Sequence, residues 1–280
     1  MKRTIAMLLA VMMLFALTAC GTNSTEPAGS AAEEETPAEP ITLYVFAAAS
    51  MTETLDQVIE LYKDVAPNVT IIPTYDGSGA LVDQITQGAD CDIFISAAQK
   101  QMNMIDAEDT TGTNTDGLDY VLPGTRVDIL ENKVVLAVPD DNPKDIQSFS
   151  DLATDKLTLL ALGNEDVPVG AYSLEILTAL GILDTLEQSQ RITYGSNVKE
   201  VTTYVKEGTV DAGIIYATDA FSANLTVVDQ ADTSLCRAVI YPAAVLNVSQ
   251  NQQAARDFLE FLQSDAAMEV FESVGFAPAP

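Results

Sequence analysis

The sequence lacks histidine altogether, and it contains only 3 cysteines and 13 basic residues in 280. Without histidine, the chain has neither the commonest general base nor the commonest metal ligand. Three cysteines are too few for a disulfide scaffold or a cysteine-rich zinc site. The 41 acidic residues give a formal net charge of −28, and lysine and arginine form no patch, so a nucleic-acid partner is not expected.

The first nineteen residues have the pattern of a secretory signal peptide. Lys2 and Arg3 precede an apolar run that is shorter than the about 20 residues a membrane-spanning helix needs. The sequence Leu-Thr-Ala-Cys at residues 17–20 resembles the lipobox of bacterial lipoproteins. The resemblance implies cleavage just before Cys20, so that residues 1–19 are removed, and a diacylglycerol anchor on its sulfur. The alternative is an ordinary signal peptide with an incidental cysteine.

Residues 20–40 are expected to be the lipidated cysteine and a disordered acidic tether. Ala, Glu, Thr, Ser and Pro dominate this stretch, and it has no apolar periodicity. Such a composition buries too little apolar surface to offset the entropy lost on ordering. We therefore expect an exported protein, anchored by lipid to a cell membrane on its extracellular or periplasmic face.

From residue 41 onward, short apolar strands alternate with helical patterns, which predicts α/β layers around largely parallel sheets. Strands are expected at residues 41–48, 69–73, 93–96, 133–139, 157–162, 192–194, 212–216 and 239–246. Helices are expected at residues 51–65, 81–87, 170–180, 197–207, 254–262 and 266–274.

This order of elements suits two lobes of similar size. Residues 41–130 and 237–280 would form lobe 1, and residues 131–236, hinge crossings included, would form lobe 2. A small ligand would occupy the cleft between the lobes.

Four predicted strand-to-helix junctions carry small or glycine-rich sequences. They are AAAS at residues 47–50, DGSGA at 76–80, DVPVG at 166–170 and GSNV at 195–198. Unpaired N–H groups at the positive end of a helix hold an anion without cationic side chains. The alternative is that Ser50, Ser78 and Ser196 are ordinary N-caps, with Glu53 completing a capping box after Ser50. The junctions therefore indicate a small-anion site without establishing one.

Seven segments, in the same order, resemble the periplasmic molybdate-binding proteins. They are VFAAAS at residues 45–50, GSGAL at 77–81 with QI at 84–85, DIFISA at 92–97, DVPVGAY at 166–172, NVK at 197–199, GIIYATDA at 213–220 and VGF at 274–276. The resemblance spans residues 41–276 and implies the two-lobed (type II) periplasmic-binding-protein fold. It also implies a monomer without a cofactor or enzymatic activity that captures molybdate or tungstate and delivers it to the permease of an ABC importer.

The resemblance further implies which groups hold the oxyanion. Carried over position by position, the neutral donors are the hydroxyls of Ser50, Ser78 and Tyr216 and the backbone N–H groups of Val169 and Val198. Molybdate would thus be bound through its oxygens, with no direct metal-ion ligand. A fully ionised dianion has only acceptor oxygens, so neutral donors match it.

Two other functions stay open. Sulfate and phosphate are also tetrahedral oxyanions, and sulfate would differ from molybdate and tungstate by size rather than by charge. A surface hydrolase with Ser50 or Ser78 as nucleophile would need a general base, which a chain without histidine supplies poorly. Cys91 and Cys236 are either two separate thiols or one disulfide.

Overall fold

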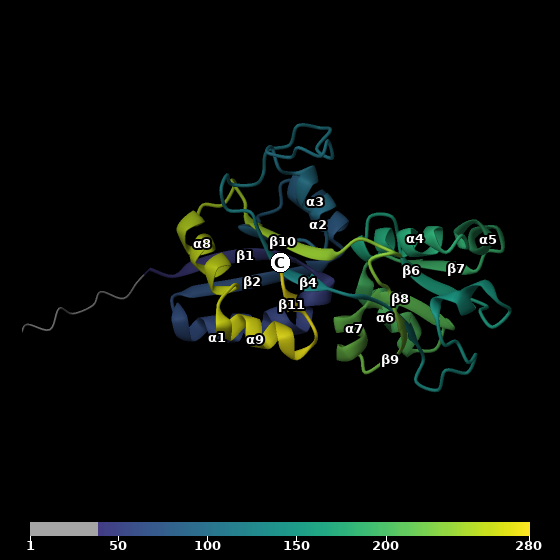
Figure 1. The fold of residues 1–280 in the computed structure, drawn as a ribbon. Helices are drawn as coiled ribbons and strands as arrows, with labels where there is room; N and C mark the ends of the chain where they lie inside the picture. The colour runs from purple at the N-terminus through teal and green to yellow at the C-terminus, as the bar shows by residue number, and fades with distance from the viewer. Residues whose placement is uncertain (1–38) are drawn as a thin grey trace, which may run out of the picture. The chain divides into compact units, whose positions relative to one another are not determined.

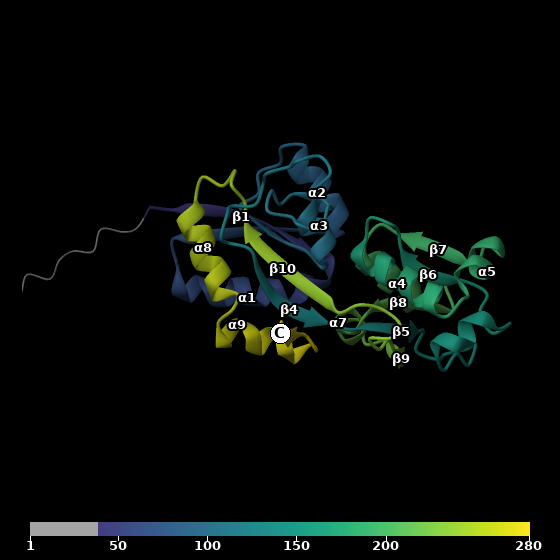
Figure 2. The same ribbon diagram turned by 45° about the horizontal axis from the view of Figure 1, so that its top comes forward.

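The computed structural model describes residues 39–280. The predicted signal peptide, Cys20 and nearly all of the predicted tether therefore lie outside the described residues. The described chain forms two β-sheets, each accompanied by helices (Figures 1 and 2). No helix in residues 39–280 is long and apolar enough to cross a membrane.

The first lobe is built on a six-stranded sheet in the order β11-β4-β10-β3-β1-β2. Its strands are β1 (Ile41–Ala48), β2 (Val69–Asp76), β3 (Ile93–Ile95), β4 (Val127–Asn132), β10 (Val239–Val245) and β11 (Ala277–Pro278). Its helical segments are η1 (Ala49–Met51), α1 (Thr52–Val65), α2 (Ser78–Thr86), α3 (Gln99–Met104), α8 (Gln252–Phe261) and α9 (Asp265–Ser273). The C-terminal end of the chain, yellow in Figure 1, returns to this lobe, where β11 pairs with β4.

The second lobe is built on a five-stranded sheet in the order β7-β6-β8-β5-β9. Its strands are β5 (Val134–Val138), β6 (Leu160–Gly163), β7 (Ile192–Gly195), β8 (Ala212–Tyr216) and β9 (Thr226–Gln230). Its helical segments are η2 (Phe149–Ala153), α4 (Pro168–Ala179), α5 (Leu183–Gln188), α6 (Val198–Lys206) and α7 (Ala217–Ser222).

The apolar periodicities of the sequence account for the layers of the first lobe. On β1, Leu43 and Val45 belong to the hydrophobic cluster that includes α1, whereas Phe46 packs in a second cluster with Leu81 and Ile85 of α2. Alternate residues of a strand point to opposite faces of its sheet, so β1 is covered on both faces. The expected strand at residues 41–48 and the expected helix that follows it are confirmed.

Both sheets are mixed, which corrects the expectation of largely parallel sheets. β1 is parallel to β2 and β3, but β10 is antiparallel to β3 and β4. In the second sheet β6 is parallel to β7 and β8, but β5 is antiparallel to β8 and β9. The strands that break the parallel pattern are β5 and β10, by which the chain enters each lobe from the other, and neither is joined to a neighbour in its sheet by the crossover helix that parallel pairs require.

The two lobes meet backbone to backbone at the start of α2. A Cβ atom on Gly77 would lie 2.8 Å from the carbonyl oxygen of Ser196, and one on Gly79 would lie 2.5 Å from that of Asp166. Both distances are shorter than real Cβ atoms approach. The small residues of this junction therefore let the other lobe come close, in addition to leaving room for a ligand.

We predict that Gly79→Ala keeps the fold but opposes closure of the lobes. Alanine favours a helix over glycine by about 1 kcal/mol, so the melting temperature should not fall. The new methyl group should clash with Asp166 only when the lobes are together, at a cost of about 1–3 kcal/mol. Small-angle X-ray scattering in the presence of molybdate should show a larger radius of gyration than for the wild type.

The matched control is Gln87→Ala, at the exposed C-cap of the same helix. It should scatter as the wild type does. Equal radii of gyration for Gly79→Ala and the wild type would contradict the role of Gly79.

Candidate functional site

A small cavity lies where helices of the two lobes begin. Its volume is ≈ 10 Å³, about the space that one water-sized sphere occupies. The lining residues are Ala48, Ala49, Ser50, Asp76, Gly77, Ser78, Ala97, Val167, Pro168, Val169, Val198 and Tyr216. None of these residues is a lysine or an arginine. In this conformation the cavity has room for about one water-sized group, and it excludes sugars and peptides.

The structure brings all five predicted donor residues to this one cavity. Ser50 and Ser78 come from the first lobe, and Val169, Val198 and Tyr216 come from the second. Val169 and Val198 lie in the first turns of α4 and α6, where backbone N–H groups have no partner within the helix. Their convergence is geometric, and their role as ligand donors stays a prediction.

Ser50 and Ser78 are not the N-caps that the alternative reading of the junctions required. The cap residue of α2 is Gly77, and the hydroxyl oxygen of Ser78 accepts the backbone N–H of Ala97 at 3.1 Å. The hydroxyl oxygen of Ser50 lies 2.8 Å from that of Tyr241. An oxygen that already accepts a hydrogen bond retains its own proton for a further partner, so Ser78 is prepared to donate into the cavity.

Ser196 lies outside the cavity, and it is not an N-cap either. Its N–H and hydroxyl donate to the carboxylate of Glu200 at 2.6 and 2.9 Å. The cap of α6 is Asn197, whose side chain accepts the N–H of Glu200 at 3.0 Å. The expected capping box after Ser50 is also wrong, because the carboxylate of Glu53 bonds to Lys199 instead.

Tyr216 presents a buried hydroxyl without a hydrogen-bond partner among residues 39–280. Burial raises the pKa of Tyr216 well above its ordinary value, and the neighbouring Tyr241, Tyr172 and Asp219 raise it further. The hydroxyl therefore keeps its proton at any physiological pH. An unpaired buried donor costs about 1–3 kcal/mol, and a ligand acceptor in the cavity would recover that energy.

Asp76 is the carboxylate among the cavity residues, and it is held by both lobes. Its Oδ1 accepts the N–H of Gly77 at 2.8 Å and the side-chain amide of Asn197 at 3.1 Å. Because Asn197 belongs to α6 of the second lobe, this bond links the lobes beside the cavity. Asn197 and Asp76 were not predicted as partners, since they lie 121 residues apart in the sequence.

Comparison with known proteins identifies the family. Residues 43–277 match the bacterial extracellular solute-binding proteins. The chain belongs to this family. It is a family of binding proteins rather than of enzymes.

Three related proteins add detail to this membership. A putative ABC transporter substrate-binding lipoprotein of Bacillus subtilis, YvgL, is 37% identical over 239 residues, which are 84% of this chain and 86% of that protein. The molybdate-binding protein ModA of Haemophilus influenzae is 33% identical over 238 residues, which are 83% of this chain and 89% of that protein. The molybdate-binding protein ModA of Mycobacterium bovis is 31% identical over 272 residues, which are 96% of each chain.

Solved structures confirm the predicted two-lobed α/β fold of this solute-binding protein. The substrate-binding domain of a putative molybdenum ABC transporter from Clostridium difficile is 35% identical, with a TM-score of 0.64 over 86% of this chain and 100% of that one. The periplasmic molybdate-binding protein of Azotobacter vinelandii has a TM-score of 0.74 over 85% of this chain and 99% of that one. At 22% identity, the second similarity concerns the fold alone.

Cys91, Cys236 and Asp92 lie outside the cavity of the solute-binding protein. Cys91 and Cys236 are both free thiols, which settles the alternative of a disulfide between them. The carboxylate of Asp92 accepts the N–H of Tyr44 and the hydroxyl of Ser249, so it joins strand β1 to the segment that follows β10. None of these residues lines the cavity.

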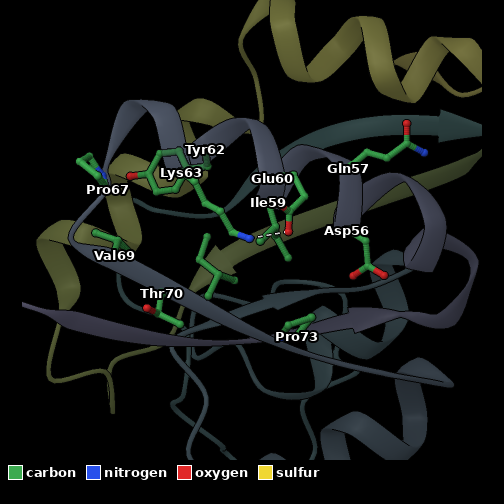
Figure 3. Close-up of a pocket in the computed structure, with 11 residues that line it drawn as sticks. Asp56, Gln57, Ile59, Glu60, Tyr62, Lys63, Pro67, Val69, Thr70 and Pro73 are labelled. Atoms are coloured by element: carbon green, nitrogen blue, oxygen red, sulfur yellow. Dashed lines mark hydrogen bonds and ion pairs between the residues drawn. The ribbon is translucent and has the colours of Figure 1, made fainter.

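A surface hollow of ≈ 640 Å³ lies away from the cavity, between α1 and the edge strand β2 (Figure 3). The side chains of Lys63 and Glu60 point toward one another there and form an ion pair of 2.5 Å. Both side chains are largely exposed, so this ion pair contributes little. The hollow gathers no convergent set of donors, and we assign no site to it.

An ion pair between the lobes lies beside the cavity. Lys199 of α6 donates to both carboxylate oxygens of Glu53 on α1, at 2.8 and 2.6 Å. The same ammonium lies 3.2 Å from the carboxylate of Asp219, without the alignment of a hydrogen bond. Burial alone would lower the pKa of Lys199, but the two carboxylates outweigh burial and raise it. The ammonium group of Lys199 thus pairs with one carboxylate of each lobe, Glu53 of the first and Asp219 of the second.

We predict that Asp219 makes the stability of the protein depend on pH. Burial raises the pKa of Asp219 from 3.8 to about 6, against the opposing effect of Lys199. A raised carboxyl pKa stabilises the folded state below about pH 4, and this stabilisation is lost as the pH rises through 6. The free energy of unfolding should therefore decrease by about 3 kcal/mol over this interval because of Asp219.

Asp219→Asn, which keeps the shape of the side chain, should remove this decrease. Chemical denaturation at a series of pH values measures the difference between the variant and the wild type. Asp257→Asn, at an exposed position of α8, should keep the wild-type pH dependence. If the free energy of unfolding changes with pH equally in Asp219→Asn and in the wild type, Asp219 is not the cause of the pH dependence.

Proposed function

We propose that this solute-binding protein captures molybdate or tungstate outside the cytoplasm and delivers it to the permease of an ABC importer. The observation that carries the proposal is the convergence of Ser50, Ser78, Val169, Val198 and Tyr216 on one cavity of ≈ 10 Å³. The names of the relatives from Haemophilus influenzae and Mycobacterium bovis support this ligand.

The chemistry of the cavity suits a fully ionised tetrahedral oxyanion. Each oxygen of such an ion accepts hydrogen bonds, and each of the five groups has an N–H or an O–H to donate. Hydrogen bonds to a charged partner contribute about 1.5–3 kcal/mol each, more than bonds between neutral groups. Neutral donors at contact distance can therefore hold an anion on a protein whose formal charge is −28, because solvent screens the distant acidic residues.

The proposal includes neither a catalytic step nor a cofactor. The hydroxyls of Ser50 and Ser78 contact the Tyr241 hydroxyl and the Ala97 N–H, respectively. Neither contact is a general base of the kind that activates a serine nucleophile. The described residues also hold no cluster of three or more His, Cys, Asp or Glu side chains that could bind a metal ion. The metal would enter as part of the oxyanion, through its oxygens.

Titration calorimetry with molybdate, tungstate, sulfate and phosphate tests the proposal. We expect sub-micromolar binding of molybdate or tungstate at one site per chain. Tyr216→Phe should weaken this binding about tenfold or more, because it removes one charge-assisted bond. The same substitution should not lower the melting temperature, because the lost hydroxyl has no partner among residues 39–280.

The matched control is Tyr194→Phe, at an exposed tyrosine of the second lobe. It should bind all four ions as the wild type does. Preference for sulfate or phosphate over both metal oxyanions would replace the proposed ligand with another oxyanion. Absence of binding to all four ions would reject an oxyanion receptor.

We also propose that Cys20 carries a lipid anchor and that the receptor acts as a monomer. The substrate-binding lipoprotein of Bacillus subtilis supports the anchor. Cys20→Ala should release the protein from membranes into the medium or periplasm, and the affinity for the oxyanion should stay unchanged. Fractionation of cells followed by immunoblotting measures the release. Persistence of the variant in the membrane fraction would contradict a lipid anchor at this position.

A further inference from the structure

A series of hydrogen-bonded buried side chains leads from the passage between the lobes to the cavity. Asn132 is the last residue of β4, Tyr241 lies on the neighbouring strand β10, and Ser50 lies in η1. Figure 2 shows β4 and β10 side by side near the point where the chain enters β5. All three side chains are at least 95% buried, and Ser50 lines the cavity.

The orientation of the Asn132 amide is determined by its neighbour. Its Oδ1 accepts the backbone N–H of Lys133 at 2.8 Å. Its Nδ2 therefore donates to Tyr241, at 3.2 Å, and to Thr218, at 2.9 Å. The reverse orientation would set the amide N–H₂ against the N–H of Lys133, with two donors face to face.

The orientation of Asn132 determines the direction of the next bond. The hydroxyl oxygens of Tyr241 and Ser50 lie 2.8 Å apart, and either could donate. Tyr241 already accepts a hydrogen bond from Asn132. If Ser50 also donated to it, the proton of the buried Tyr241 hydroxyl would lack an acceptor, which costs about 1–3 kcal/mol. With Tyr241 donating to Ser50, the proton left over is that of Ser50, which lines the cavity, where a ligand can accept it.

We propose that Asn132 and Tyr241 are positioning residues that make Ser50 an obligate donor toward the ligand, so that the site selects fully ionised oxyanions over protonated ones. This inference rests on the proposed oxyanion in the cavity. A protonated oxyanion presents an O–H where Ser50 offers an O–H, and one of the two protons stays unpaired. The selection thus acts on the protonation state of the ligand, independently of its size.

The hydrogen-bond relay from Asn132 through Tyr241 to Ser50 lies in the first lobe, and its direction does not depend on closure of the two lobes. Ser50, Tyr241 and Asn132 all belong to elements of the first lobe, and only the second Asn132 proton reaches Thr218 on α7 of the second lobe. The donor direction of Ser50 is therefore established before the second lobe contributes its own groups. Preorganised donors of this kind do not lose free energy to reorientation when the ligand arrives.

Asn132→Asp reverses the relay and gives the sharpest test. A carboxylate accepts the proton of Tyr241, whose oxygen then accepts from Ser50, so that Ser50 offers the ligand a lone pair. Binding is measured at about pH 8, where phosphate is mostly a dianion with one proton. Sulfate has the same charge and no proton, so the ratio of sulfate to phosphate affinity cancels repulsion by the new carboxylate.

We expect Asn132→Asp to lower this ratio about a hundredfold, and Tyr241→Phe, which frees Ser50 to rotate, to lower it about tenfold. Affinity for molybdate, measured with the same full-length chain in detergent, should fall more in Asn132→Asp than in Tyr241→Phe. Thr218→Val is the matched control, because it removes the other partner of Asn132 and should keep the ratio. Equal weakening of all oxyanions by the variants, or a wild type that prefers phosphate, would overturn the relay.

Nuclear magnetic resonance tests the relay without any ligand. In protein with isotope-labelled tyrosine, the Tyr241 hydroxyl proton is the signal that Tyr241→Phe removes. This proton should show an Overhauser effect to the Cβ protons of Ser50 in the wild type, and Asn132→Asp should abolish it. An unchanged Overhauser effect in Asn132→Asp, or none in the wild type, rejects the relay even if molybdate binds. Its presence in a protein that binds no oxyanion would reject the proposed function alone.

Discussion

The contact between two stretches of backbone, Gly77 with Ser196 and Gly79 with Asp166, is the constraint on which the cavity depends. An anion held without cations needs several N–H and O–H groups around it, and one helix start supplies only a few of them. The additional donors come from the second lobe, which must approach to within atomic contact. Side chains larger than hydrogen at these glycines would hold the two donor sets apart, whatever the chemistry of the donors.

Behind the donors, aromatic rings connect the lobes without carrying charge. Tyr216 contacts Tyr172 and Tyr241 edge to face, with ring centroids 6.4 and 6.0 Å apart, and Tyr241 contacts Phe276 at 5.4 Å. Such contacts restrain the orientation of the rings, and therefore the positions of the two hydroxyls. Tyr216 lines the cavity from the second lobe, while Tyr241 contacts Ser50 in the first, so one row of aromatic rings lies behind both sides of the cavity.

Much of this molecule could be predicted from the sequence where the signal is local. The strand Ala212–Tyr216 has its predicted bounds because its apolar run is uninterrupted and its side chains are buried throughout. The strand Val127–Asn132 was missed because Asp128 and Glu131 break the apolar pattern at exposed or half-buried positions. The convergence of the donor residues came from family resemblance for Tyr216 and from helix starts for the others. The contact of Ser50 with Tyr241 spans 191 residues, and no local pattern encodes such a pairing.

The small volume of the cavity limits the number of ions that one receptor molecule can hold. A space of ≈ 10 Å³ lined by both lobes has no room for a second ion, so a molecule that binds an ion here would hold only one. With 41 acidic and 13 basic residues, the protein as a whole repels further anions. The fraction of such receptors that hold an ion would therefore follow the concentration of that ion outside the cytoplasm. Each receptor would deliver one ion at a time to its partner.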